Sequence, residues 1–286
     1  MKTRKIKKVF ESQRFIEGAG VRLNRVFGSH NTPLFDPFLL LDHFQSDQPE
    51  DFLAGFPWHP HRGIETVTYM IKGTIEHGDS LGNKGVIHDG DVQWMTAGSG
   101  IIHQEMPKNG KGINGFQLWV NLPRKHKMID PRYQEIKKSN VPETSIGNAL
   151  VKVICGKVGP AEGPADAVAG EPEYLDVNLP ANEIFRYAVP SGRNVFAYIY
   201  QGTAHFEEGE TVDEKNAILF GDGNEVVVYS GDLPVHFLII SGSPFNEPIA
   251  WGGPIVMNNE VELKQAFSEF HEGTFLKTGN KDTGKG

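Results

Sequence analysis

The sequence predicts an all-β protein built from two β-barrel domains of similar size, with one short helix near the C-terminus. Three observations predict this class. The 33 glycines and 18 prolines among 286 residues favour short strands joined by tight turns over long helices. An internal repeat divides the chain near its middle. One stretch alone has clear helical periodicity.

Runs of β-branched and aromatic residues bounded by turn residues mark the strands. The first clear run, ETVTYMI, covers 65–71 and leads into the turn pair Lys72-Gly73. The Gly-, Pro- and Ala-rich stretch 156–172 has no apolar period, so it predicts a long connector or an exposed loop. Further strands are expected at 86–87, 91–95, 115–121, 174–177, 195–200, 217–220, 225–229 and 236–240.

The repeat aligns YMIKGTIEH at 69–77 with YIYQGTAHF at 198–206, an offset of 129 residues. Each copy has the pattern of a strand, a Gly-Thr turn and a second strand. Two similar β-domains are therefore expected, one over 1–130 and the other over 131–286.

The helix is expected at 259–271 (NEVELKQAFSEFH), with Asn258 or Asn259 as its N-cap and Gly273 past its end. It would belong to the second domain, and the tail that follows, TGNKDTGKG, predicts disorder. The basic N-terminus, MKTRKIKK, is not followed by an apolar segment, so it predicts a solvated, partly frayed end and no secretory signal.

Composition narrows the class of protein. The formal net charge of −8 argues against a general affinity for nucleic acid. No apolar run approaches the roughly 20 residues needed to span a bilayer, so no membrane partner is expected. The single cysteine, Cys155, excludes an intramolecular disulfide and fits a reducing compartment. The expected location is the cytoplasm.

Two short pairs of residues carry the strongest chemical signal. His59 and His61 are spaced i, i+2, so on a strand both imidazoles project from the same face. His103 and Glu105 repeat this spacing 42 residues after His61. On neighbouring strands the two pairs would direct three nitrogens and one carboxylate to a common point, leaving coordination positions open as a catalytic metal needs.

This ligand set suits one divalent iron, copper, nickel, manganese or zinc ion, and the residues alone do not choose between them. The alternative is a histidine-lined pocket without metal. No GxSxG, P-loop or strand-flanked GxGxxG motif is present, so serine hydrolase and nucleotide-dependent functions have no support.

The stretches FPWHPHRGIETVTYMIKGTIEHGDSLGN and GDVQWMTAGSGIIHQEMP resemble the pirin family of the cupin superfamily, as do DPFLLLDHF and GFQLWVNLP. The resemblance implies a bicupin of two face-to-face antiparallel barrels, with a metal in the N-terminal barrel only. It implies Fe(II) as the metal and His59, His61, His103 and Glu105 as its ligands. Carrying the 129-residue offset to the second barrel places Ala188 and Pro190 where His59 and His61 would be, and neither can bind a metal.

Three further residues have open roles. The general cupin pattern would use Glu65 as a ligand, whereas pirins use a glutamate beside the third histidine, so Glu65 is expected to be structural. Arg62 is expected either to hydrogen-bond a carboxylate ligand or a substrate oxygen, or to form a surface salt bridge. His43 lies where many pirins have an acidic residue.

The resemblance also implies an activity, that of a quercetin 2,3-dioxygenase. A small enolic or flavonol substrate would meet O2 at the metal, with Glu105 as general base. The alternative is a non-enzymatic, iron- and redox-responsive regulator that binds a transcription factor or a metabolic enzyme. A cupin sugar isomerase or epimerase is a weaker third possibility.

Overall fold

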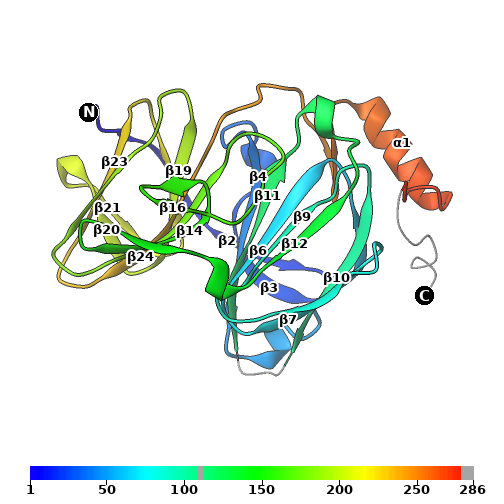
Figure 1. Ribbon diagram of the computed structural model, residues 1–286, viewed down its shortest axis with the longest axis horizontal. Helices are drawn as coiled ribbons and strands as arrows, with labels where there is room; N and C mark the ends of the chain where they lie inside the picture. The colour runs from blue at the N-terminus through cyan, green and yellow to red at the C-terminus, as the bar shows by residue number, and fades with distance from the viewer. Residues whose placement is uncertain (109–111, 278–286) are drawn as a thin grey trace. The chain divides into compact units, whose positions relative to one another are not determined.

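The computed structural model describes residues 1–108 and 112–277, and within them the regular structure is mostly β-strand, with one α-helix (Figure 1). The expected disordered tail at 278–286 lies outside the described residues. Unit 1 comprises Met1–Gln13, Asn31–Pro37 and Ser139–Pro244, and unit 2 comprises Arg14–His30, Phe38–Lys138 and the chain from Phe245 onward. None of the described helices is long and apolar enough to cross a membrane.

Unit 2 contains a seven-stranded and a four-stranded antiparallel sheet, and the chain passes repeatedly between them. Consecutive strands therefore line a common interior. In spatial order the larger sheet is β12 (Arg132–Ile136), β9 (Val92–Thr96), β6 (Ile64–Lys72), β11 (Ile113–Asn121), β4 (Phe38–Ser46), β3 (Val21–Phe27) and β2 (Gln13–Glu17). The smaller sheet is β5 (Phe56–His61), β10 (Ile101–Lys108), β7 (Thr74–Asp79) and β8 (Lys84–Ile87).

Unit 1 repeats this arrangement of seven and four strands. The larger sheet is β1 (Ile6–Glu11), β22 (Asn216–Phe220), β19 (Asn194–Gln201), β24 (Val235–Gly242), β17 (Glu173–Leu179), β14 (Ala149–Cys155) and β13 (Glu143–Ile146). The smaller sheet is β18 (Ile184–Ala188), β23 (Glu225–Ser230), β20 (Thr203–His205) and β21 (Thr211–Asp213). The sequence repeat corresponds to the consecutive strands β6 and β7 in unit 2 and β19 and β20 in unit 1. In each unit the chain passes at this point from the seven-stranded sheet to the four-stranded sheet.

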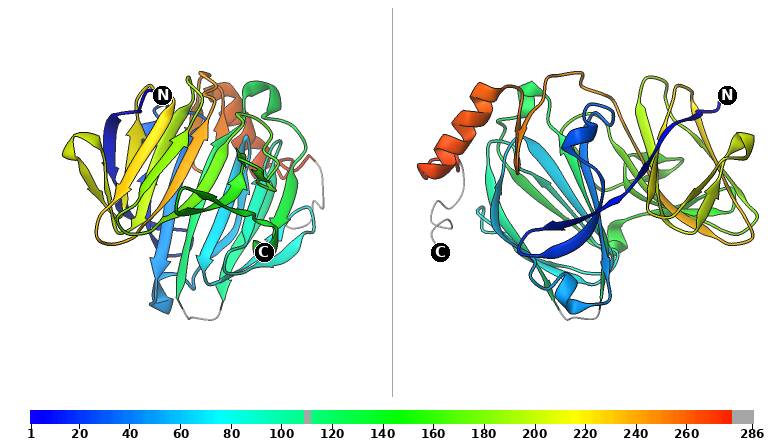
Figure 2. Two further views of the ribbon diagram at one scale, coloured as in Figure 1. Left: turned by 60° about the vertical axis from the view of Figure 1, so that its left-hand side comes forward. Right: turned by 180° about the vertical axis from the view of Figure 1, so that it is seen from behind.

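The N-terminus is ordered within unit 1, so the expectation of a frayed end is wrong. Strand β1 pairs with β22, and the left view of Figure 2 shows it in dark blue at the sheet edge. Arg4 is buried and donates hydrogen bonds to the carbonyls of Pro190 and Gly221 at 3.0 and 2.9 Å. These contacts, made with residues distant in the sequence, keep the N-terminal segment ordered although its own sequence is polar.

The C-terminal segment belongs to unit 2, which differs from the expected domain 131–286. It consists of the hairpin β25 (Ala250–Gly252) and β26 (Ile255–Met257) followed by α1 (Glu260–His271). The expected connector at 156–172 contains the small hairpin β15 (Lys157–Val158) and β16 (Ala161–Glu162). Short 3-10 helices occur at Ser29–Asn31, Pro49–Asp51, Arg124–His126, Lys138–Asn140 and Glu207–Gly209.

Helix α1 begins where the sequence predicts, because Asn259 caps it. The Asn259 side chain accepts hydrogen bonds from the backbone N–H groups of Val261 and Glu262 at 3.1 and 2.9 Å. We expect Asn259→Ala to lower the free energy of unfolding by about 1 kcal/mol, because two N–H groups lose their acceptor. Urea unfolding followed by circular dichroism would measure this. An unchanged midpoint would show that the cap contributes nothing to stability.

Candidate metal centre

Strands β5 and β10 of unit 2 bring three histidine side chains together. The strands are antiparallel neighbours, and His103 on β10 pairs directly with His59 on β5. His61 lies two residues along β5, on the same side of the strand as His59. The ligand nitrogens of the three imidazoles lie within 4.8 Å of one another, and the closest ring centroids, those of His59 and His103, are 4.3 Å apart. This group could hold a metal ion.

Backbone carbonyls bind one nitrogen of two of these rings and so leave the other nitrogen of each ring facing the cluster. The Nδ1 atoms of His59 and His61 donate to the carbonyls of Pro57 and Pro254 at 2.8 and 3.0 Å. A carbonyl only accepts, so each Nδ1 carries the ring proton and each Nε2 presents a lone pair. The two Nε2 atoms are 3.1 Å apart. Two lone pairs facing each other at this distance repel unless a cation lies between them, so the arrangement fits a shared metal.

His103 gives independent support for a cation. It is fully buried, and neither of its ring nitrogens has a hydrogen-bond partner among the described residues. A buried polar group left without a partner costs about 1–3 kcal/mol. Burial, reinforced by neighbouring histidines, lowers the pKa of His61 and His103 well below the ordinary histidine value. The neutral imidazole that results is the form that binds metal.

Glu105 lies on the same strand as His103 but stands apart from the group of three ligand nitrogens. A register irregularity between β10 and β5 falls between His103 and Glu105. The Glu105 Oε1 atom accepts hydrogen bonds from Thr68 at 2.8 Å and Gln93 at 3.4 Å, and Oε2 accepts one from Gln117 at 2.9 Å. Its role as a fourth ligand stays a prediction.

A second polar pair next to the cluster was not singled out from the sequence. His77 on β7 is buried, pairs in register with Glu105, and its ring centroid lies 5.6 Å from that of His103. His77 Nε2 is 3.2 Å from Asp79 Oδ2, and its ring stacks on Tyr133 at 4.7 Å. The His-Gly-Asp spacing, the same i, i+2 pattern as His59 and His61, is the signal that could have identified this pair.

The remaining residues named from the sequence have structural partners. Glu65 is buried and accepts a hydrogen bond from Thr96 Oγ1 at 2.7 Å, as its expected structural role requires. His43 is buried, with its Nε2 2.9 Å from Asn114 Oδ1 and its ring against Phe116. Neither belongs to the histidine group.

Arg62 is buried and ion-paired with Glu269, so the expectation of a surface salt bridge is wrong.

In unit 1 the corresponding strands line an apolar core. Strand β23 takes the place of β10, and its inward side chains, Val226 and Val228, are buried among other apolar residues. Phe185 and Tyr187 of β18 belong to the same cluster. One His-x-Glu pair does occur here, His205 and Glu207, but β20 ends at His205 and Glu207 begins a 3-10 helix. Within the described residues, the histidine group of unit 2 is the one cluster of ligand-type side chains close enough to hold a metal.

Two family models and several known proteins match this chain. The family model described as Pirin matches residues 20–120, and that described as the Pirin C-terminal cupin domain matches residues 174–276. A pirin-like protein of Caulobacter vibrioides is 44% identical, covering 96% of this chain and 100% of its own. Pirin of Rattus norvegicus is 37% identical, covering 89% and 87%.

Solved structures show the same fold. The crystal structure of a quercetin 2,3-dioxygenase from Acinetobacter baumannii is 30% identical, with a TM-score of 0.88, covering 96% of this chain and 98% of that one. This likeness, together with the two matching strand orders, confirms the predicted fold of two cupin barrels. On these matches, the chain belongs to the pirin family.

Proposed function

We propose that this protein is a metal-dependent dioxygenase that cleaves a flavonol such as quercetin with O2. Its metal would be a single iron ion held by His59, His61 and His103, with Glu105 as the fourth ligand. The observation that carries the proposal is the convergence of the three histidines, in which His103 has two unsatisfied nitrogens among the described residues. The similarity to a solved protein named as a quercetin 2,3-dioxygenase supports the choice of reaction.

The histidines fit the metal because their nitrogens are already arranged to receive it. Carbonyl partners hold two of the rings in one tautomer, so little reorganisation is needed on binding. A bound divalent cation would lower the pKa of a substrate hydroxyl and so ease its ionisation. Trp119 makes a T-shaped contact with His61, with ring centroids 5.0 Å apart, so a large apolar side chain lies beside the cluster. Such a surface suits a planar aromatic substrate.

Glu105 is the chain's proton acceptor in this proposal. Three side-chain donors, Thr68, Gln93 and Gln117, hold its carboxylate within the barrel. A carboxylate that loosens from the metal could take the proton of the substrate hydroxyl. The ionised flavonol would then be the electron-rich species that reacts with O2.

The test is an oxygen-dependence assay with quercetin. The protein is loaded with Fe(II) without air, and the visible absorbance of quercetin is followed before and after air is admitted. We expect the absorbance to fall only with both iron and O2 present, with turnover of about 1–1,000 per second, the range common to enzymes. Protein treated with a chelator serves as the control. If the iron-loaded protein consumes no O2 with quercetin, the proposed activity is wrong.

A further inference from the structure

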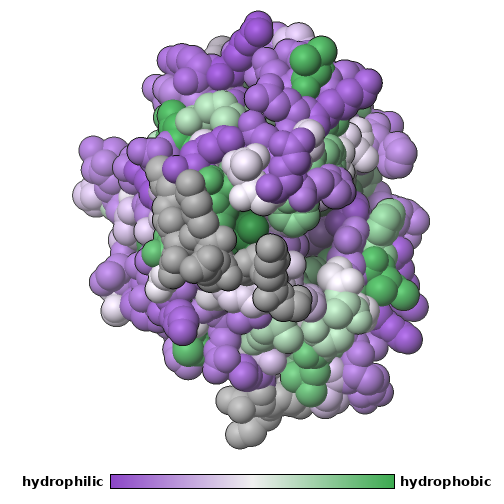
Figure 3. All heavy atoms as spheres, turned by 90° about the vertical axis from the view of Figure 1, so that its right-hand side faces the viewer, coloured by the Kyte–Doolittle hydropathy of each residue, from purple (hydrophilic) through white to green (hydrophobic). Residues whose placement is uncertain are grey.

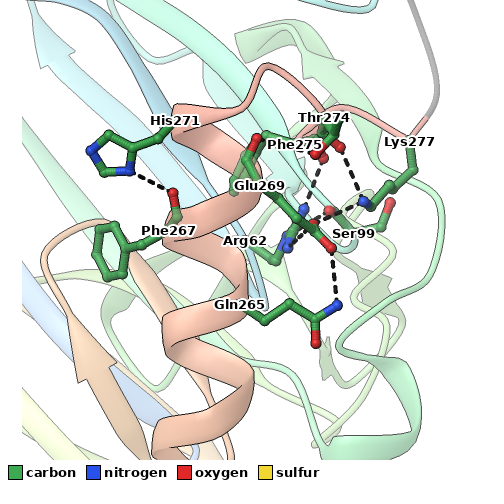
Figure 4. Close-up of polar contacts among 9 residues, drawn as sticks. All are labelled: Arg62, Ser99, Gln265, Phe267, Glu269, His271, Thr274, Phe275 and Lys277. Carbon is green, nitrogen blue, oxygen red and sulfur yellow. Dashed lines mark hydrogen bonds and ion pairs between the residues drawn. The ribbon is translucent and has the colours of Figure 1, made fainter.

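The residue next to His61 connects the metal centre to the C-terminal segment, residues 250–277 of unit 2. Arg62 is 2% exposed, and its guanidinium makes three hydrogen bonds (Figure 4). Nε donates to the Ser99 carbonyl at 2.7 Å, and the two terminal nitrogens donate to Glu269 Oε2 and the Phe275 carbonyl, each at 2.8 Å. The guanidinium also lies 4.2 Å from the centroid of the Phe275 ring.

These contacts join three separate parts of the chain. Arg62 directly follows β5, which carries His59 and His61, and Ser99 lies two residues before β10, which carries His103. Glu269 and Phe275 lie in and just after α1. A single buried side chain thus links both ligand-bearing strands to the C-terminal segment.

Glu269 is itself held firmly. It accepts hydrogen bonds from Arg62, Lys277 and Gln265, as the dashed lines in Figure 4 show. Burial opposes its ionisation, but these donors outweigh that effect and lower the pKa of Glu269 to about 2. Glu269 therefore stays ionised at neutral pH and keeps its pairing with Arg62.

The backbone beside His61 also lies against this segment. Val256 N donates to the Arg62 carbonyl at 3.1 Å, and Arg62 forms a parallel bridge with Ile255. Gly63 has a φ of +78°, and a Cβ placed there would lie 2.0 Å from the Val256 carbonyl oxygen. Only glycine permits an approach this close.

The close contact between the two backbone segments brings one carbonyl within hydrogen-bonding distance of a ligand imidazole. Pro254, in the turn between β25 and β26, accepts the hydrogen bond from His61 Nδ1 at 3.0 Å. That bond assigns the ring proton to Nδ1 and directs the Nε2 lone pair at the histidine cluster.

Apolar packing fixes the helix that carries Glu269. Leu263 and Ala266 of α1 pack with Phe275 and with Ile102, the residue before His103. The face of the molecule shown in Figure 3 is mostly hydrophilic, with apolar atoms in separate patches. Helix α1 thus has its buried residues on the side that meets the barrel.

From these contacts we propose that the C-terminal segment is a positioning element for the metal centre. Pro254 orients His61, and the Arg62–Glu269 pair holds Pro254 in place. The inference rests on the proposed metal site and adds positioning residues to it: Arg62, Pro254 and Glu269 touch neither metal nor substrate but set the geometry of a residue that touches the metal.

Copper(II) titration of the full-length protein tests this without any measurement of activity. The variants are Glu269→Ala and the conservative Glu269→Gln, with Glu272→Ala as the matched control, since Glu272 bonds Ser268 near the helix end and not Arg62. We expect Glu269→Ala to weaken copper affinity about 10-fold. That is the lower end of the loss expected when a residue that supports a metal ligand is removed. Its copper(II) electron paramagnetic resonance spectrum should shift as His61 reorients. The copper affinity of Glu269→Gln should lie between those of Glu269→Ala and wild type.

The outcomes separate the inference from the proposed function. If Glu269→Ala lowers the Tm but leaves copper affinity and the spectrum unchanged, the segment only stabilises the barrel and the inference is wrong. If wild-type protein binds no copper, the metal site fails, and the inference fails with it. Should Glu269→Ala not fold, Glu269→Gln keeps an oxygen acceptor for Arg62 and decides the question by the same two readouts.

Discussion

Replacing His103 with leucine is expected to remove metal binding while leaving the metal-free fold at least as stable as wild type. His103 supplies one of three converging nitrogens, so the affinity for the metal should fall by more than about 100-fold. That is the upper end of the loss expected when a residue that only hydrogen-bonds a metal ligand is removed. Dioxygenase turnover should be lost with the metal. In chelator-treated protein, however, leucine removes a buried group with two unpartnered nitrogens among the described residues. The free energy of unfolding should then rise by up to about 1–3 kcal/mol.

Metal content by elemental analysis and thermal unfolding with chelator would measure the two effects. His88→Leu is the matched control, because His88 is an exposed histidine in the same barrel and outside the cluster. Unchanged iron content in His103→Leu would contradict the assigned site. A large loss of stability in the metal-free variant would instead show that His103 is needed for packing.

The fold class could be predicted from the sequence because its signals are local. The runs at 65–71 and 195–200 are rich in β-branched and aromatic residues and are followed by turn residues, and both lie within strands, β6 and β19. The helix was predictable for the same reason, since Asn259 and the apolar spacing after it are adjacent in the chain.

Contacts distant in the sequence could not be predicted. Strand β1 buries one residue, Phe10, so its pattern is that of a solvated segment, and only pairing with β22 makes it a strand. The apolar face of α1 predicts that the helix packs on something, but not that its partners include Ile102. Domain limits drawn from a linear repeat therefore missed the assignment of the C-terminal segment to unit 2.

The candidate site divides in the same way. The i, i+2 spacing predicted that His59 and His61 share a face, because strand geometry alone dictates it. The carbonyl that orients His61 belongs to Pro254, 193 residues away in the chain, and no pattern in the sequence indicates this contact. The donors to Glu105 come from β6, β9 and β11, where Thr68, Gln93 and Gln117 resemble ordinary strand residues.

Glu105→Gln is expected to reduce turnover by about 100- to 10,000-fold, the usual contribution of a general base, while the three histidines retain most of the metal. The substitution keeps the shape of the side chain but replaces one acceptor oxygen with an NH2 group. Gln117 cannot adapt easily, because its Oε1 accepts from Trp119 Nε1 at 3.2 Å, which directs its NH2 at Glu105. The new amide would therefore turn its oxygen to Gln117 and its NH2 group to Thr68 Oγ1, a hydroxyl that can accept. The loss of stability should then stay within about 0.5–1.5 kcal/mol, the net contribution of one hydrogen bond.

Turnover of quercetin, iron content and urea unfolding, each measured on the same preparation, would separate these effects. Glu76→Gln is the control, since Glu76 forms an exposed ion pair with Lys108 and its loss should change stability by less than about 0.5 kcal/mol. If Glu105→Gln lost iron as completely as His103→Leu, Glu105 would act mainly as a ligand. If it kept both iron and full turnover, another group must accept the proton, and His77, buried beside His103 with Nδ1 unpartnered among the described residues, would be the next to test. Loss of turnover without loss of iron would show that Glu105 is needed as a base and is not needed to keep the metal bound.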